Sequence, residues 1–314
     1  MDVEHTTVKK LGANGIVTQE IVAITYEPEL SIYTDQNRHC DSRVGVITTT
    51  AEEVLRRRGA VFRITSGSKA FDKLLNGGFE SQAITELIGE SGSGKSQIAH
   101  TLCVLVQLPE HRGGLGDCRV LFIDTDGTFS PERIVQIASS RCLLGEKTLK
   151  NILISRVNSS KYLAYVMDEA RKIIPSQNIK LLIVDSLTSC FQGERGESQS
   201  ATQKLQKLNR ILNRLHQLSQ TFNIPVLVTN RATTVLRPSE KDLLPHVFSY
   251  RIWLTRGKHG SRVAYLYSGI SRPNSTASFK ISSKGIEDLT GNKTESVYEN
   301  QEASQHALYC ELKV

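Results

Sequence analysis

The chain has 314 residues, 39% of them hydrophobic and 23% charged, which is enough apolar content for an ordinary globular core in one large or two unequal domains. No apolar run approaches the length of a membrane span, so no membrane partner is expected. The polar residues 1–5 lack a secretory apolar region, which predicts a nuclear location, or a cytosolic one in a cell without a nucleus. The six cysteines include no C-x-x-C pair, which argues against zinc and favours reduced thiols.

The positive charge is concentrated in the second half of the chain. The net charge is +7, but residues 186–284 alone hold 15 basic and 4 acidic side chains. Such a basic segment indicates a polyanionic partner, nucleic acid first. The alternative is a solvated basic face without a ligand.

The first third of the chain has weak patterns. Residues 1–45 are expected to form a small helical N-terminal domain. Residues 46–66 are expected to form a linker and subunit-contact segment, with extended pieces at 46–50 and 60–64 around a short helical segment at 52–58.

Residues 67–289 alternate between apolar strands and amphipathic helices. Helices are expected over 69–75, 97–104, 131–139, 161–174 and 199–221, and strands over 83–88, 119–124, 152–154, 181–185 and 224–230. After residue 250 the pattern changes to strands alone, at 251–254, 262–267 and 278–281. This order predicts an α/β fold with a mainly parallel central sheet covered on both faces, followed by a loose polar tail at 290–314.

Residues 89–96, Gly-Glu-Ser-Gly-Ser-Gly-Lys-Ser, match the phosphate-loop pattern G-x-x-x-x-G-K-S/T between a strand and a helix. The glycines allow backbone N–H groups to surround phosphate oxygens, and the following helix adds its positive end. Lys95 can reach the β- and γ-phosphates, and Ser96 can hold Mg²⁺. The predicted ligands of ATP and Mg²⁺ in this segment are Gly89, Glu90, Ser91, Gly92, Ser93, Gly94, Lys95, Ser96 and Gln97. The alternative is a glycine loop that is followed by a lysine only by chance, or a site that no longer hydrolyses nucleotide.

Two carboxylates follow strands and complete the predicted site. Asp185 ends an apolar strand, where a second Mg²⁺-directed carboxylate acts through a coordinated water. Asp126 follows the strand at 119–124 and can orient and activate the attacking water, so it is a candidate catalytic residue together with Lys95. The alternative for Asp126 is a helix-capping residue without a catalytic role.

Two irregular segments, 191–198 and 231–241, leave strands on the side of the phosphate loop. Each carries an arginine, Arg195 or Arg231, among small and hydroxyl residues. This composition suits contacts to nucleic-acid phosphates from side chains and backbone N–H groups. The alternative for each is an ordinary surface loop.

In this order, the motifs over residues 46–289 resemble the RecA/RadA recombinases, most closely the eukaryotic mitotic and meiotic strand-exchange proteins. The resemblance rests on the phosphate loop and on residues 64–69, 74–78, 84–87, 100–104, 107–109, 113–114, 123–125, 127–129, 131–133, 184–186, 195–197 and 258–262. It implies a RecA-like P-loop ATPase core with a small N-terminal helical domain. It also implies a DNA-dependent ATPase that forms filaments on single-stranded DNA, pairs it with double-stranded DNA and exchanges strands in recombination and repair.

The resemblance assigns further residues. Arg133 would flank the adenine, His246 would sense a neighbouring subunit's γ-phosphate, and Pro273 would lie where a neighbour covers the base. Residues 193–200 and 231–245 match the two DNA-binding loops, and the DNA contacts this implies are Arg195, Gly196, Arg231, Thr233 and Arg237.

The chain departs from the family pattern at several places, and both DNA-binding loops look shortened. Asp126 stands where the family has Glu, which predicts slow hydrolysis. Arg231 stands where the family has Gln, which affects signalling between nucleotide and DNA. The Phe-x-x-Ala subunit hook appears as Thr-Thr-Thr-Ala at 48–51, and threonine would fill an apolar pocket poorly.

These departures favour an alternative function. The chain would then be a recombinase paralogue that binds ATP and joins another recombinase in a hetero-oligomer, as an adaptor or mediator without strand exchange of its own. A hexameric helicase or clock-type kinase is a third interpretation, which the order of motifs disfavours.

Overall fold

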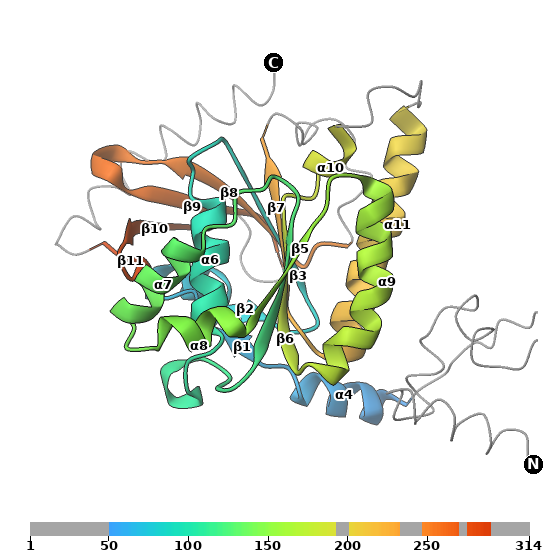
Figure 1. The fold of residues 1–314 in the computed structure, drawn as a ribbon, viewed down its shortest axis with the longest axis horizontal. Helices are drawn as coiled ribbons and strands as arrows, with labels where there is room; N and C mark the ends of the chain where they lie inside the picture. The colour runs from blue at the N-terminus through green and yellow to red at the C-terminus, as the bar shows by residue number, and fades with distance from the viewer. Residues whose placement is uncertain (1–49, 193–200, 233–246, 270–274, 290–314) are drawn as a thin grey trace, which may run out of the picture.

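The computed structural model describes residues 50–192, 201–232, 247–269 and 275–289 (Figure 1). Its centre is a nine-stranded sheet in the order β11-β10-β9-β8-β3-β7-β6-β4-β5. Every pairing from β8 to β5 is parallel, and the three pairings on the β11 side are antiparallel. The predicted α/β class with a mainly parallel sheet is therefore confirmed.

The strands of the large sheet are β3 (Ile84–Gly89), β4 (Arg119–Asp124), β5 (Ile152–Arg156), β6 (Ile179–Asp185), β7 (Val226–Arg231), β8 (Tyr250–Arg256), β9 (Arg262–Gly269), β10 (Ser275–Ser282) and β11 (Gly285–Asp288). A separate two-stranded sheet pairs β1 (Arg63–Ile64) with β2 (Phe79–Glu80). The α-helices are α4 (Ala51–Gly59), α5 (Lys69–Leu74), α6 (Lys95–Leu105), α7 (Pro131–Ser140), α8 (Gly145–Lys150), α9 (Ser160–Ser176), α10 (Ser189–Gln192) and α11 (Ala201–Phe222). Two 3-10 turns, Glu110–Arg112 and Lys258–Gly260, complete the described elements.

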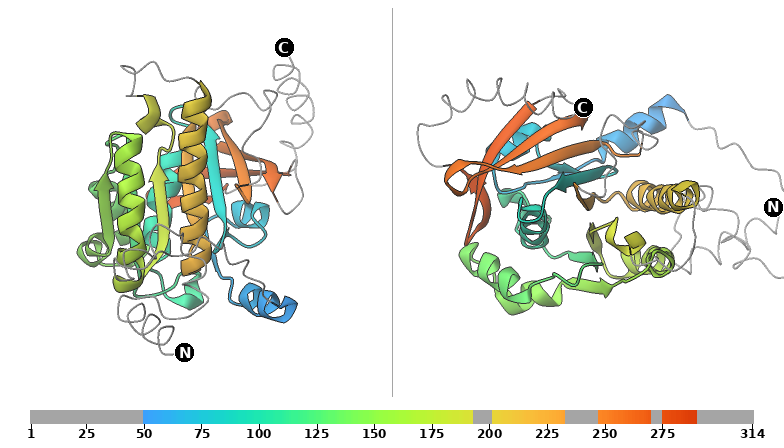
Figure 2. Two further views of the ribbon diagram at one scale, coloured as in Figure 1. Left: turned by 90° about the vertical axis from the view of Figure 1, so that its right-hand side faces the viewer. Right: turned by 90° about the horizontal axis from the view of Figure 1, so that it is seen from above.

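Helices cover both faces of the parallel part of the sheet (Figures 1 and 2). Helices α6, α7 and α8 lie on one face, and α9 and α11 lie on the other. Successive strand residues point to opposite faces, so each strand contributes to two cores. Phe122 and Ile183 belong to the core under α6, whereas Ile123 and Val184 belong to the core under α9 and α11. This double burial explains the continuous apolar runs of these strands.

Every helix and strand predicted within residues 67–289 is present, with ends shifted by a few residues at most. Four short helices or strands were not predicted: β2, α8, α10 and β11. The predicted extended piece at 60–64 is shorter than expected, because Ala60 forms the C-cap of α4 and the strand begins at Arg63. Helix α5 ends at Leu74, and the chain turns where Asn76, Gly77 and Gly78 all take positive φ values.

The expected N-terminal domain at 1–45, the start of the linker and the tail at 290–314 lie outside the described residues. Among the residues that are described, no helix combines the length and the apolar character that crossing a membrane requires.

Candidate active site

The phosphate loop lies between the end of β3 and the start of α6, at the carboxyl edge of the parallel strands. Gly92 and Gly94 have φ values of 77° and 111°, which L side chains rarely adopt. A Cβ on Gly89 would lie 2.4 Å from the carbonyl oxygen of Leu254. The loop conformation therefore favours glycine at these positions.

Two polar groups of the loop are suited to an anionic ligand. The ammonium of Lys95 donates to the carbonyl oxygens of Gly89 and Glu90, at 2.7 and 2.8 Å. Burial lowers the pKa of Lys95, and the nearby Asp185 carboxylate opposes that shift. The hydroxyl oxygen of Ser93 is buried and has no hydrogen-bond partner among the described residues. The Lys95 ammonium is a buried cation that binds only carbonyl oxygens here, and the Ser93 hydroxyl is unsatisfied. Both groups fit the phosphates of a nucleotide.

Asp185 lies beside the loop at the end of β6 and is 3% exposed. One carboxylate oxygen, Oδ1, accepts a short hydrogen bond from Thr229 Oγ1, and the other, Oδ2, has no partner among the described residues. Burial raises the pKa of Asp185, and the hydroxyls of Thr229 and Ser96 lower it. An unsatisfied, buried carboxylate oxygen near a serine hydroxyl fits a water-coordinated Mg²⁺.

Asp126 is held by an arginine and does not cap a helix. Its Oδ2 lies 3.0 Å from Nη2 of Arg231 and 3.5 Å from Oγ of Ser186. The N-cap of α7 is instead Ser130, whose hydroxyl accepts from Arg133 N. The expectation that Asp126 could cap this helix is therefore wrong, and its catalytic role stays a prediction.

The turn that carries Asp126 is organised by the buried Asp124. The Asp124 carboxylate accepts hydrogen bonds from the backbone N–H groups of Gly127, Thr128 and Phe129, at 2.7 to 3.2 Å. The N–H of Ser130, at the end of this turn, donates to Nε2 of the buried His100 on α6, at 3.4 Å. The loop bearing Asp126 is thus tied to the helix that follows the phosphate loop.

Arg133 and Gln97 also lie together. Arg133 Nε donates to Gln97 Oε1 at 2.8 Å, and Arg133 Nη2 donates to the carbonyl oxygen of Ser282 at 2.6 Å. These bonds fix the guanidinium between α6, α7 and the end of β10. The position suits the predicted role beside a base, which stays a prediction.

The remaining predicted residues divide by position. Arg231 is the predicted DNA contact that the structure describes, and its guanidinium lies at Asp126. His246, Pro273, Arg195, Gly196, Thr233 and Arg237 lie outside the described residues, as do most positions of both predicted DNA-binding loops.

A buried polar network behind the site was not predicted. Glu86 on β3 accepts from Arg251 Nε at 2.7 Å and from Asn230 Nδ2 at 2.6 Å. The Asn230 Oδ1 atom accepts from the N–H of Thr188 at 3.2 Å. The network therefore links three neighbouring strands to the segment that follows Asp185. Its sequence signal was a charged or amide side chain inside each of three apolar strands.

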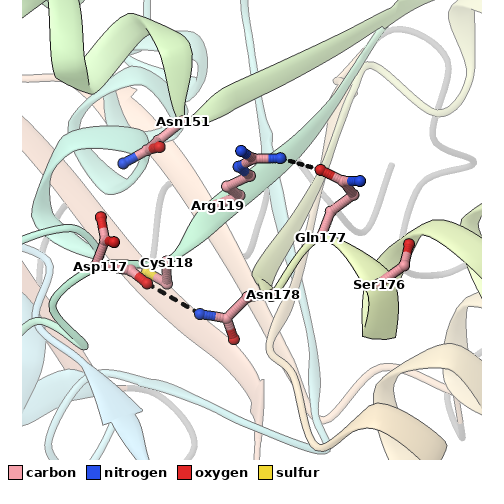
Figure 3. Close-up of a pocket in the computed structure, with 7 residues that line it drawn as sticks. All are labelled: Asp117, Cys118, Arg119, Asn151, Ser176, Gln177 and Asn178. Carbon is pink, nitrogen blue, oxygen red and sulfur yellow. Dashed lines mark hydrogen bonds between the residues drawn. The ribbon is translucent and has the colours of Figure 1, made fainter.

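A cavity of about 480 Å³ opens beside the site at the carboxyl ends of β4 and β5. Its lining residues include Asp126, Arg156 and Tyr162. A second cavity, of about 300 Å³, is lined by residues such as Asp117, Arg119 and Gln177 (Figure 3). It lies at the opposite, amino edge of the strands and is separate from the phosphate loop.

Comparison with known proteins agrees with this geometry. Residues 57–289 match the model of the Rad51 family. The chain is also 38% identical over 258 residues to the DNA repair and recombination protein RadA of Cenarchaeum symbiosum (strain A). That match covers 79% of this chain, and the chain spans 65% of the length of that relative.

Proposed function

This chain belongs to the Rad51 family, and from that premise we propose that it is an ATP-dependent recombinase acting on single-stranded DNA in homologous recombination and DNA repair. In this role it would form a filament on the single strand, pair it with homologous double-stranded DNA and exchange strands. Its archaeal relative is named a DNA repair and recombination protein, which supports this assignment.

The observation that carries the proposal is the convergence of Lys95, Asp126 and Asp185 at one edge of the sheet. Lys95 would hold the terminal phosphates of ATP, with the glycine loop enclosing them. Ser96 and Asp185 would hold Mg²⁺, the latter through a coordinated water, and the bound metal would neutralise charge on the phosphates. Asp126 would orient the attacking water. These residues together make the chain a DNA-dependent ATPase in this proposal.

DNA would bind at the segments that follow β6 and β7. Arg231 and the loop positions at Arg195, Gly196, Thr233 and Arg237 would contact phosphates, and no base-specific contact is expected. The excess of basic residues over 186–284 supports a polyanionic partner there. A chromosomal DNA substrate implies a nuclear location in a cell with a nucleus.

A second candidate function is an ATP-binding paralogue that assists another recombinase without exchanging strands. The ion pair between Asp126 and Arg231 favours it, because a carboxylate engaged by a cation is a weaker partner for water. This candidate predicts ATP binding with little hydrolysis.

One experiment separates the two functions. The purified chain is incubated with ATP, Mg²⁺ and single-stranded DNA, imaged for filaments and assayed for joint molecules with homologous duplex. Filaments and joint molecules formed by the chain alone support the recombinase. If the chain binds ATP but joint molecules form only after a second recombinase is added, the result supports the adaptor. Failure to bind ATP refutes both functions.

A further inference from the structure

We propose that Thr125 is a positioning residue for ATP hydrolysis, because its hydroxyl fixes the chain that carries Asp126 to the chain that follows Asp185. The inference rests on the proposed function and deepens it. Thr125 acts through Asp126 and not on the nucleotide itself, so its loss affects the chemical step and not the binding of ATP.

The hydroxyl of Thr125 makes two hydrogen bonds to a single residue. Thr125 Oγ1 donates to the carbonyl oxygen of Ser186 at 2.6 Å and accepts from the N–H of Ser186 at 2.8 Å. A hydroxyl has one proton to donate and lone pairs that accept, so this one group satisfies both backbone groups of Ser186. Ser186 is 1% exposed, so water cannot readily replace either partner.

These bonds lie where the two strands that lead to the carboxylates end. Asp124 and Asp185 are the last residues of β4 and β6 and are paired in the parallel register. The N–H of Thr125 donates to the carbonyl oxygen of Asp185 at 2.9 Å, which extends this pairing by one residue. The Thr125 hydroxyl adds a connection to the next residue, Ser186. The chain just before Asp126 is therefore fixed to the chain just after Asp185.

A chain of hydroxyls reaches the Asp126 carboxylate from the same residue. Ser186 Oγ lies 3.5 Å from Asp126 Oδ2 and 2.5 Å from Ser189 Oγ. An ionised carboxylate only accepts hydrogen bonds, so in that form of Asp126 the Ser186 hydroxyl donates to it and Ser189 donates to Ser186. Thr125 thus holds, by its backbone, the residue whose side chain reaches Asp126.

The turn that carries Asp126 is consequently fixed on both sides. The three backbone N–H groups that follow Asp126 donate to the Asp124 carboxylate, and the Thr125 hydroxyl holds the residue that precedes it. A general base must lie within hydrogen-bonding reach of the water that it activates, and a displacement of about 1 Å can lower a rate by about 100-fold. Of the two anchors, Thr125 is the one that sets Asp126 relative to the metal-directed Asp185.

The phosphate loop is held by separate contacts. Lys95 donates to the carbonyl oxygens of Gly89 and Glu90, and neither bond involves Thr125. Removal of the Thr125 hydroxyl therefore leaves the groups that would bind the phosphates in place. This separation allows the positioning role to be distinguished from a general loss of structure.

The test measures kcat for ATP hydrolysis in the presence of single-stranded DNA, and the affinity for ATPγS by calorimetry with Mg²⁺. Thr125→Val keeps the shape of the side chain and removes the hydroxyl, so kcat is expected to fall at least about 10-fold while ATPγS affinity stays within about 2-fold. Thr125→Ala removes the hydroxyl without placing a methyl group against Ser186 and is expected to behave in the same way. Thr125→Ser keeps the hydroxyl and is expected to stay within about 3-fold of the parent kcat.

The matched control is Thr148→Val on α8. Thr148 is buried, and its hydroxyl also donates to a backbone carbonyl oxygen, that of Leu144, at 2.9 Å. The same substitution therefore removes the same kind of hydrogen bond away from the phosphate loop, and kcat is expected to stay within about 2-fold of the parent. Thermal unfolding of each variant confirms that it folds.

A double-mutant cycle tests whether Thr125 acts through Asp126. In an Asp126→Asn background, measured by single-turnover hydrolysis, Thr125→Val is expected to cause no further loss, because the carboxylate that Thr125 positions is already absent. A loss by the same factor in both backgrounds overturns the inference.

The remaining outcomes separate the inference from the proposed function. A parent-like kcat in both hydroxyl-free variants, or a Thr125→Ser variant as slow as Thr125→Val, overturns the positioning role and leaves the proposed function standing. A parent chain that binds ATPγS without hydrolysing ATP overturns the inference together with the ATPase activity. A parent chain that binds no nucleotide overturns the proposed function as well.

Discussion

Among the ion pairs of the described residues, the buried pair of Arg251 and Glu86 should cost the most stability when one partner is removed. The two side chains are 5% and 2% exposed, and their charged atoms lie 2.7 Å apart. The Arg251 guanidinium also lies over the rings of Phe248 and Tyr267, at 5.4 and 5.1 Å from their centroids. Arg251→Met removes the cation while keeping similar bulk, and it leaves the Glu86 carboxylate buried without that positive charge beside it.

The expected cost follows from this burial. Leaving one partner of a buried pair uncompensated destabilises by about 3–5 kcal/mol, which is a large part of the total stability of a typical domain. The double variant Glu86→Gln/Arg251→Met removes both charges, so it should recover at least about 2 kcal/mol of that loss. The control is Lys147→Met, which breaks an exposed pair with Asp117 at 3.3 Å, with side chains 66% and 79% exposed. That change should cost no more than about 1 kcal/mol.

Urea unfolding checks these values, with the midpoint and slope fitted together so that a change in the denatured state is visible. Equal losses of stability in Arg251→Met and Lys147→Met would contradict the stabilising role of the buried pair. A double variant no more stable than Arg251→Met alone would contradict it as well.

Three predictions concern the site itself. Gly92→Ala should reduce ATP affinity at least about 10-fold, because φ is 77° there and the added Cβ would lie 2.3 Å from the Arg256 guanidinium; equal affinity in an equilibrium titration would contradict the loop geometry. Thr229→Val removes a donor to Asp185, whose pKa burial already raises. The Asp185 carboxylate should then become protonated at a higher pH than in the parent. Mg²⁺-dependent ATP binding should therefore weaken earlier as the pH drops from about 7.5 to about 5.5, and superimposable pH profiles would count against this. Asp126→Glu should hydrolyse ATP several-fold faster than the parent, since the longer carboxylate reaches water better, and identical turnover in a phosphate-release assay would remove the reason for expecting slow hydrolysis.

Much of the parallel core could be predicted from sequence because its strands are continuous apolar runs separated by amphipathic helices. The same pattern placed Lys95, Asp126 and Asp185 at one edge, since parallel strands end together. The short β11 lacked such a signal. It is a strand through its pairing with β10, and its last residue, Asp288, accepts hydrogen bonds from the backbone N–H groups of Lys69 and Ala70 at 3.0 Å.

The contacts between the site residues could not be predicted, because they depend on strand order. Arg231 meets Asp126 across 105 positions of sequence only because β7 and β4 both flank β6. Glu86, Asn230 and Arg251 are each a polar residue within an apolar strand. That they form one network follows from the order β8-β3-β7, which no local pattern specifies.

In the proposed function, ATP bound at the Lys95 loop raises the affinity of the chain for single-stranded DNA. The most direct measurement is the affinity for a fluorescent single-stranded oligonucleotide at fixed salt, with ATPγS, with ADP and without nucleotide, for the parent chain and for Lys95→Ala. We expect ATPγS to tighten binding about 10-fold or more in the parent and to have no effect in Lys95→Ala. The same affinity under all three conditions, unchanged by the substitution, would contradict the account.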